Sequence, residues 1–394
     1  MSPLLFALVM EPLAIAIRAD TKMEGFVRPT GEERIALYAD DVLLFLGDTN
    51  QSIKQAMTIF RDFGKLSGLV INWEKSALMP IDPIESQTSV EIPQMKKVEI
   101  MKYLGIFITS DPNKYIKYNL VPLLSKFKKK IQIWRYLPLS VAGRCNLIKM
   151  LWMPQLLYIL HNSPIWIGKK WFRKIDTLFR ELIWKGGQSR IKLQTLQLPI
   201  REGGMAVPHP QCYFLAAQLQ HIGVRTESGG DTNLGLMFLG APHKTAVEVL
   251  EANSFTNRIP TVKMALKVWK AVKILGGQEG MTEYTPLWDN RNLQELESVG
   301  KINEWAAKGI IRLAQIYEGR TIKTFATIRK EYDVPKHTFY RYLQTRHALD
   351  AQFKRVGPIW VKTLILQKLG NWSKTKGFIS EVYSYIHTYN SKVE

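Results

Sequence analysis

The sequence predicts an α+β fold in which a small β-hairpin lies among helices. Two apolar runs of strand length, 35–37 and 42–46, flank the four residues Tyr38-Ala39-Asp40-Asp41, so they predict a hairpin with a tight polar turn. Apolar residues at helical spacing predict helices before and after the hairpin. The chain has 394 residues, of which 46% are hydrophobic, enough for two or three domains with their own cores.

The helices around this hairpin are predicted from apolar spacing. A mostly apolar stretch between residues 2 and 17 predicts a helix that precedes the hairpin. After the hairpin, Ile53, Met57 and Phe60 recur at spacings of four and three. Residues so spaced share one face of a helix, so a second helix is expected here.

The chain that follows the second helix is expected to return to strands. Gly64 or Gly68 ends the helix, because glycine is common just past a helix end. Residues 69–72 are a short apolar run that predicts a strand, and residues 102–108 predict another. The polar residues of 80–96, with three prolines, predict an insertion between these strands.

Positive charge is concentrated in one segment of the chain. Residues 112–192 hold 17 Lys and Arg but only two acidic residues, a net charge of +15 out of +20 for the whole chain. A solvated surface usually mixes both signs, so this excess favours binding to the phosphates of a nucleic acid. An ordinary solvated face is the alternative.

Three helices are predicted within this basic segment. Ser140 is expected to cap the second, which runs to about Leu160 and bends at Pro154. The first and third have apolar stripes, formed by Leu120, Leu123, Leu124, Phe127, Ile131 and Trp134, and by Trp171, Phe172, Ile175, Leu178, Phe179, Leu182 and Ile183. The tryptophans Trp134, Trp152, Trp166, Trp171 and Trp184 are predicted as core residues rather than base-stacking ones. The cations expected to contact nucleic acid lie mostly off the stripes: Lys128, Lys129, Lys130, Arg173 and Lys174.

The rest of the chain is predicted to be mostly helical. Residues 226–233 are rich in Gly, Ser, Thr and Asp, which predicts a linker or loop. Beyond it, apolar stripes at 262–275, 302–317 and 359–369 predict helices.

The two adjacent carboxylates of Asp40 and Asp41 are the residues most suggestive of chemistry. The tip of a hairpin holds them rigidly, and their oxygens can converge on a hard cation such as Mg²⁺, which proteins usually bind through one or two carboxylates plus substrate phosphates. An Asp-Asp β-turn without a metal is the other interpretation, since Asp is favoured in turns for local hydrogen-bonding reasons.

Four motifs occur in an order that resembles the reverse transcriptase of non-LTR (LINE-type) retrotransposons. They are Ser2-Pro3-Leu4-Leu5-Phe6, Tyr38-Ala39-Asp40-Asp41, the segment from Gly68 to Lys75, and Tyr103-Leu104-Gly105. Segments further along also resemble such proteins, so the resemblance covers nearly the whole chain. One motif alone would be weak evidence, but the ordered set is specific.

The resemblance implies an activity and a role for each motif. The activity is RNA-directed DNA polymerisation, in which Mg²⁺-dependent chemistry adds deoxynucleotides to a DNA primer on an RNA template. Asp40 and Asp41 would be catalytic metal ligands, and Lys75 a catalytic residue that approaches the triphosphate, although an ordinary loop lysine is equally expected. Nucleic-acid contacts would come from Ser2, Pro3, Tyr38, Tyr103, Leu104 and Gly105, the last three as a primer grip.

The sequence also departs from the family pattern. The family places a further metal-binding aspartate, in motif A, before the Ser-Pro segment, and this sequence begins at Met1-Ser2-Pro3. Asp20 lacks the neighbours expected of that aspartate and is not accepted in its place. The chain is therefore expected to be a truncated enzyme that starts within motif B and is inactive alone. The alternatives are a non-catalytic nucleic-acid-binding remnant and a pseudogene product.

Three regions are expected along the chain. Residues 1–110 form a partial palm (the Tyr-Ala-Asp-Asp hairpin plus helices), residues 111–225 a basic helical thumb with a connector, and residues 226–394 a helical C-terminal region.

Cys145 and Cys212 lie far apart in the sequence, which excludes a disulfide framework and a Cys-x-x-Cys zinc site and favours a reducing compartment. Neither a signal peptide nor a transmembrane helix is predicted. An intracellular location, cytoplasmic or nuclear or both, is expected.

Overall fold

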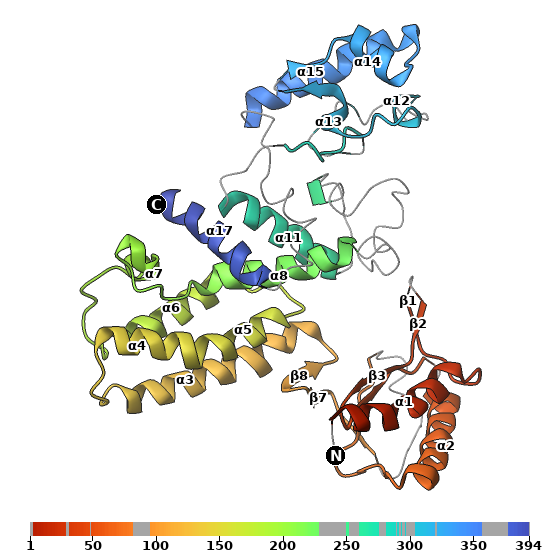
Figure 1. The fold of residues 1–394 in the computed structure, drawn as a ribbon, viewed down its shortest axis with the longest axis vertical. Coiled ribbons are helices and arrows are strands. Elements are labelled where there is room, and N and C mark those ends of the chain that lie inside the picture. The colour runs from red at the N-terminus through yellow and green to blue at the C-terminus, as the bar shows by residue number, and fades with distance from the viewer. Residues whose placement is uncertain are drawn as a thin grey trace. The chain divides into compact units, whose positions relative to one another are not determined.

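The structure is a computed structural model that describes residues 3–28, 31–47, 49–81, 95–227, 250–251, 260–275, 281–288, 290, 293, 296, 304–319, 321–356 and 377–393. Within these residues helices alternate with small two-stranded sheets, which agrees with the predicted α+β class. The chain divides into two compact units, Met1–Tyr115 and Ile116–Glu394. Figure 1 shows the elements of each.

Among its described residues, the first unit combines two helices with four pairs of strands. The helices are α1 (Pro3–Ala19) and α2 (Thr49–Ser67). Three of the pairs are antiparallel, and the pair of β5 and β6 is parallel. The strands are β1 (Phe26–Arg28), β2 (Gly31–Glu33), β3 (Ile35–Tyr38), β4 (Asp41–Leu44), β5 (Ala77–Leu78), β6 (Lys96–Lys97), β7 (Ile100–Tyr103) and β8 (Ile106–Thr109).

The hairpin of β3 and β4 packs against α1 and α2. Their buried side chains form one core that includes Leu13 and Ile17 of α1, Ile35 of β3 and Ala56 of α2. Apolar burial of this kind supplies most of the stability of a short hairpin, which is marginal in water by itself. The expected helices at the start of the chain and after the hairpin are thus confirmed, and together they fix the position of the hairpin.

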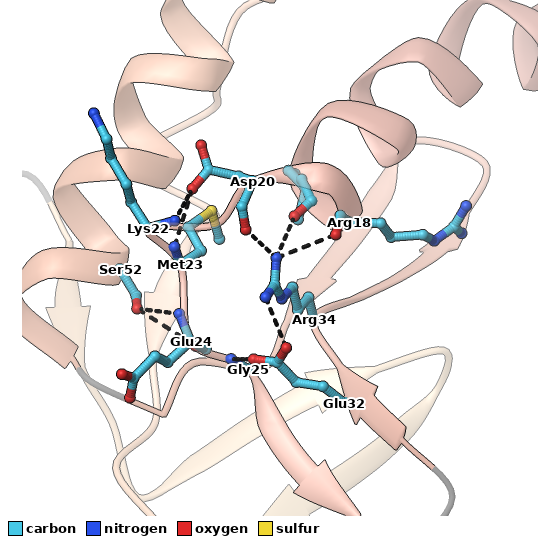
Figure 2. A network of polar contacts seen from close by, with 10 residues as sticks. Arg18, Asp20, Lys22, Met23, Glu24, Gly25, Glu32, Arg34 and Ser52 are labelled. Atoms are coloured by element: carbon cyan, nitrogen blue, oxygen red, sulfur yellow. Dashed lines mark hydrogen bonds and ion pairs between the residues drawn. The ribbon is translucent and has the colours of Figure 1, made fainter.

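Arg34 ties the end of α1 to the start of the hairpin, as Figure 2 shows. Its guanidinium donates to the carbonyls of Arg18 (3.1 Å) and Asp20 at the end of α1, and to the carboxylate of Glu32 (2.7 Å). Its own carbonyl accepts from the Phe45 N–H at 2.9 Å, beyond the end of β4. Carbonyls at a helix C-terminus lack intrahelical donors, so one residue both caps α1 and extends the hairpin ladder.

Asp20 has a structural role in the same network (Figure 2). One carboxylate oxygen accepts from the N–H groups of Lys22 (2.8 Å) and Met23 (3.0 Å), and the other from the Gln55 amide of α2 (2.7 Å). Burial raises the pKa of Asp20, but these hydrogen bonds outweigh it and hold the pKa below its ordinary value. The carboxylate is occupied by the turn after α1, which agrees with its rejection as a catalytic aspartate.

The end of α2 follows one of the two predicted alternatives. The helix ends at Ser67, and Gly68 adopts the left-handed conformation (φ 72°) and donates its N–H to the Gly64 carbonyl at 2.9 Å. Glycine adopts this conformation without a steric penalty.

The strand predicted at 69–72 was wrong. These residues are irregular, and Leu69 and Val70 are exposed rather than packed in a sheet. A four-residue apolar run carries too little periodicity to distinguish a strand from a loop. The single strand predicted at 102–108 was also wrong: the chain turns at Leu104 and Gly105, so this range holds the end of β7 and most of β8, paired as a hairpin. Most of the polar insertion at 80–96 lies outside the described residues.

The second unit is mostly helical. Its chain begins with a π-helical turn (Ile116–Leu120), and a second π-helical turn (Ile148–Trp152) joins α4 to α5. A short antiparallel pair, β9 (Tyr317–Glu318) and β10 (Thr321–Ile322), is its only sheet among the described residues. The α-helices are α3 (Val121–Trp134), α4 (Val141–Leu147), α5 (Met153–His161), α6 (Lys169–Ile183), α7 (Leu193–Gln197), α8 (Pro210–Glu227), α11 (Pro260–Leu275), α12 (Glu304–Ala307), α13 (Leu313–Ile316), α14 (Phe325–Tyr332), α15 (Phe339–Val356) and α17 (Phe378–Val393).

The three helices predicted in the basic segment are confirmed. The Ser140 hydroxyl accepts from the Gly143 N–H at 3.1 Å and caps α4. The chain then continues to His161 and departs from α-helical geometry just before Pro154, where a bend was expected. The apolar stripes of α3 and α6 both face the core.

Trp152 is the centre of this core. Its ring is fully buried, stacks on Phe127 with 4.4 Å between ring centroids, and lies 6.1 Å from the ring of Phe179. Trp134, Trp166, Trp171 and Trp184 are partly buried and pack against the same cluster. The prediction that these tryptophans are core residues is confirmed.

Helix α8 packs against α5, α6, α11 and α17, so one hydrophobic core joins the basic helices to α11 and α17. The helix predicted at 262–275 is confirmed as α11. The helix predicted at 302–317 was wrong: α12 and α13 are separate, because Gly309 turns the chain with φ 86°. The predicted helix at 359–369 and most of the linker at 226–233 lie outside the described residues.

A second hydrophobic cluster of this unit is built from residues 281–349 around Trp305 and Leu349. Cys145 and Cys212 are buried and form no disulfide. None of the helices in the described ranges is long and apolar enough to cross a membrane.

Candidate functional site

The two predicted carboxylates lie at the tip of the β3–β4 hairpin. Tyr38 pairs with Asp41, which leaves Ala39 and Asp40 as the two residues of the turn. Asp40, Asp41 and Tyr38 are all exposed, so the carboxylate oxygens face solvent. Ala39 has φ 52°, in a region that costs energy for any residue with a Cβ. A strained tip held by a packed hairpin is typical of positions where geometry serves function.

The β7–β8 hairpin has a tip of the same length. Tyr103 pairs with Ile106, and the turn residues Leu104 and Gly105 have φ 46° and 82°. Positive φ at both turn positions matches the twist of antiparallel strands, and glycine suits the second position. Leucine at the first position is strained, because bulky residues rarely adopt this conformation.

The two hairpin tips influence each other electrostatically. Burial raises the pKa of the Tyr103 phenol above its ordinary value, and the negative charge of Asp41 raises it further. Two motifs that are separated by about 60 residues in the sequence are therefore close enough for one charge to act on the other. The acidic oxygens of the first tip and the phenol of the second are groups that can bind a cation and a phosphate chain.

The other predicted residues of the first unit are placed as follows. Lys75 is exposed in a turn after α2, and its N–H donates to the Asn72 carbonyl at 3.2 Å. Pro3 begins α1, and Ser2 lies outside the described residues. Among the described residues, no cluster of three or more His, Cys, Asp or Glu side chains is arranged to hold a metal ion.

The predicted basic residues lie on the outer faces of α3 and α6, which pack against each other. Lys128, Lys129, Arg173 and Lys174 are exposed, and Lys130 is half-buried. The ammonium groups of Lys130 and Lys174 lie over the rings of Trp134 (5.3 Å) and Trp171 (4.4 Å). Within the described chain none of the five forms an ion pair with a carboxylate, so no described acidic residue neutralises their charge.

Two residues that the structure draws attention to were not predicted from the sequence. Arg34 positions the hairpin, but a single arginine before a strand carries no signal. Asp176 lies on α6 amid the cations, and its Oδ1 atom is buried without a hydrogen-bond partner in the described chain. An acidic residue between cations on both sides was the available signal.

Residues 1–108, which contain both hairpins, match the family model described as reverse transcriptase (RNA-dependent DNA polymerase). This segment is reverse transcriptase sequence of the non-LTR retrotransposon kind. Two relatives from transposable elements agree with that assignment. An uncharacterised 149 kDa protein of transposon TX1 from Xenopus laevis is 24% identical over 324 residues, which is 74% of this chain. A retrovirus-related Pol polyprotein of the type-2 retrotransposable element R2DM from Drosophila melanogaster is 26% identical over 222 residues, which is 53% of this chain.

The predicted resemblance to non-LTR reverse transcriptases is thus confirmed. The aligned regions cover 24% of the length of the Xenopus relative and 20% of the Drosophila relative. The chain therefore spans only a fraction of the curated relatives that it matches, while its resemblance to the Xenopus protein extends well beyond residue 108.

Proposed function

We propose that this chain forms part of a non-LTR retrotransposon reverse transcriptase, to which it contributes the Asp-Asp hairpin of the polymerase site and basic helices that hold the nucleic acid. The observation that carries this proposal is the exposed hairpin tip with Asp40 and Asp41, beside Tyr103 of the second hairpin, within the segment that matches the family. RNA template, DNA primer and deoxynucleotides are the substrates that this function requires.

The residues at the tip suit Mg²⁺. Two exposed carboxylates supply hard oxygen ligands, and a cation held by one or two carboxylates still has positions for substrate phosphates. When bound, such a cation neutralises the negative charge that develops on the phosphate and the attacking oxygen. Asp40 and Asp41 would hold it, Tyr38 would border the tip, and the exposed Lys75 would approach the triphosphate. In the reaction the primer 3′ oxygen forms a bond to the α-phosphorus, and pyrophosphate leaves.

The proposed metal site calls for a further ligand. Two adjacent carboxylates are present, and no third candidate ligand lies with them among the described residues. We infer that a further carboxylate, from the strand that the family calls motif A, completes the metal site. The 394-residue polypeptide alone should therefore extend primers poorly, and a role limited to binding nucleic acid is the second candidate function, favoured by the unneutralised cations of α3 and α6.

A primer-extension assay with Mg²⁺ and all four deoxynucleotides tests this proposal. The polypeptide alone should give background incorporation. Addition of a purified palm fragment that carries the motif A strand should raise incorporation, and Asp40→Asn or Asp41→Asn should return it to background. Loss of one metal-binding carboxylate removes charge stabilisation that is worth several kcal/mol, or about a thousandfold in rate.

The matched control is Asp62→Asn, which removes an exposed carboxylate on α2 that has no role in the proposal. Its carboxylate pairs with Lys65 at 2.9 Å. Incorporation that is equally lost in this variant would reflect damage to the fold rather than to the site. Incorporation in the mixture that survives both hairpin variants would contradict the proposed role of Asp40 and Asp41. Binding of nucleic acid without any extension would favour the second function.

A further inference from the structure

A pocket of about 320 Å³ lies in the second unit; it includes no residue of the two hairpins and shares Arg173 with the basic face of α6. It is lined by α6, α7, the start of α8 and Leu275 at the end of α11. Its volume is at the lower end of the range for small-ligand sites, so it suits one nucleotide rather than a duplex.

One side of the pocket is a polar stripe of α6. Lys169, Arg173, Asp176 and Arg180 follow one another at spacings of four, three and four, so they share one face of the helix. Three of the four are cations. A phosphate group near the start of this stripe would meet Lys169 and Arg173, which are one turn apart, and the arginine can bind it bidentately.

Asp176 is the exception in this stripe. Its Oδ1 atom is buried and has no hydrogen-bond partner within the described chain. It forms no ion pair within 4 Å with the cations beside it, although the charge of Arg180 acts on it. Burying an acceptor without a donor costs free energy. Such a group in a pocket calls for a donor from a ligand.

The remaining walls suit an aromatic base. Phe172, Leu193 and Leu275 provide apolar surface, and the amides of Gln194 and Gln211 can bind polar edges. His209 is also in the lining, and its Nδ1 atom accepts from the Cys212 N–H at 3.4 Å. Burial first, and the neighbouring His387 second, lower the pKa of His209 to about 4, so its ring adds no charge at neutral pH.

We propose that this pocket binds a guanine nucleotide, with the phosphate on Lys169 and Arg173 and the guanine base against Asp176. A carboxylate only accepts hydrogen bonds. Guanine alone among the common bases presents two adjacent donors, N1–H and the 2-amino group, on its Watson–Crick edge. Adenine and cytosine present one amino donor next to an acceptor, and uracil one donor between two acceptors, so each sets a lone pair against the carboxylate. Apolar and basic walls alone would not discriminate among bases.

Guanine could reach the pocket as a free nucleotide or as an unpaired residue of an RNA strand. Proteins commonly read unpaired RNA bases on this edge. The site is separate from the polymerase hairpins, so the inference does not depend on catalysis by Asp40 and Asp41.

Calorimetric titration of the whole 394-residue protein tests the inference with two pairs of probes. The first pair is GMP and IMP, which differ only in the 2-amino group. The second is an oligouridylate with one central guanosine, compared with the same strand carrying inosine. We expect GMP or the guanosine strand, or both, to bind at least tenfold more tightly than the inosine probe, since a bidentate base contact is worth about that much. A preference in the first pair identifies the free nucleotide as a ligand, and one in the second pair identifies the strand.

Asp176→Asn should abolish the preference, because an amide presents one acceptor and one donor. The matched control is Glu181→Gln on the same helix, outside this pocket, which should keep it. Asp40→Asn should also keep it, which separates this site from the polymerase. Thermal unfolding checks that the Asp176 variant is folded. Equal binding of guanosine and inosine probes by the parent, or a preference that survives Asp176→Asn, overturns the inference.

Discussion

At the scale of single residues, Asp176 and His209 oppose each other in their response to pH. Burial raises the pKa of Asp176 to about 6, and the nearby Arg180 only partly offsets this effect. The ionised carboxylate therefore destabilises the folded protein at neutral pH, and this penalty disappears as the pH falls from about 6 to about 4. His209 behaves oppositely. Its pKa is lowered to about 4, so stability is lost as the pH falls from the unfolded value near 6.5 towards 4.

Asp176→Asn should separate these two effects. The variant should be more stable than the parent at pH 7.5 by about 1–2 kcal/mol, a figure that discounts the shift for partial solvent exposure. Without the compensation from Asp176, its unfolding free energy should also fall more steeply between pH 6.5 and 4. Urea unfolding at several pH values measures both changes. A variant that is less stable than the parent at pH 7.5 would show that the carboxylate has a stabilising partner. A gain in stability together with a loss of guanine binding is the pattern expected of a functional residue.

Prediction of individual residues from sequence succeeded where a motif fixed the local geometry. The position of Asp40 and Asp41 at a hairpin tip followed from two apolar runs and a four-residue break, because a turn that short leaves few alternatives. The proximity of Asp41 and Tyr103 could not be derived, since it depends on how two separate hairpins pack. The same applies to Arg34, whose donors reach the end of α1 only in the folded unit.

At the scale of elements, amphipathic helices were predicted well and short runs poorly. The stripes of α3 and α6 repeat over three turns or more, which leaves one interpretation. The runs at 69–72 and 302–317 were misassigned because local backbone geometry decided them. Gly68 and Gly309 both adopt positive φ and end the preceding helix. Gly68 was one of two alternatives predicted from the sequence, whereas the turn at Gly309 was not predicted.

The basic faces of α3 and α6 predict how the protein binds nucleic acid. Lys128, Lys129 and Arg173 are exposed, and replacing all three with glutamine removes their charge while the length of each side chain is largely kept. Binding to an RNA–DNA duplex should weaken, and the slope of log affinity against log salt should become shallower by about one for each phosphate that is no longer neutralised. Fluorescence anisotropy at several salt concentrations measures both quantities.

The control for this prediction removes the same charge elsewhere. Lys54 of α2, Lys330 of α14 and Lys354 of α15 are also exposed. Their triple glutamine variant should keep the parent affinity and slope, apart from a small effect of net charge. If both triple variants bound equally weakly, attraction would come from the overall charge of +20 rather than from a defined surface on α3 and α6.

At the scale of the whole molecule, the two units differ in how completely their elements are packed. The two hydrophobic clusters of the second unit are built entirely from residues between 120 and 386. The first unit holds one small cluster and, among its described residues, four separate two-stranded sheets. A two-stranded sheet exposes both outer edges, and Phe26 and Val27 of β1 are exposed apolar residues beside such an edge. Open apolar edges promote pairing between molecules.

The fragment Ile116–Glu394 should therefore be more soluble and more monomeric than the full chain. The fragment keeps every residue of the two hydrophobic clusters of the second unit, whereas the full chain also carries the open strand edges of the first unit. Size-exclusion chromatography at equal protein concentration compares the two. In the full chain, Val27→Lys should reduce association, because a charge beside an edge strand disfavours pairing while the buried core is unchanged. A monodisperse full chain beside an aggregating fragment would show that the first unit closes its own edges and that the second depends on it.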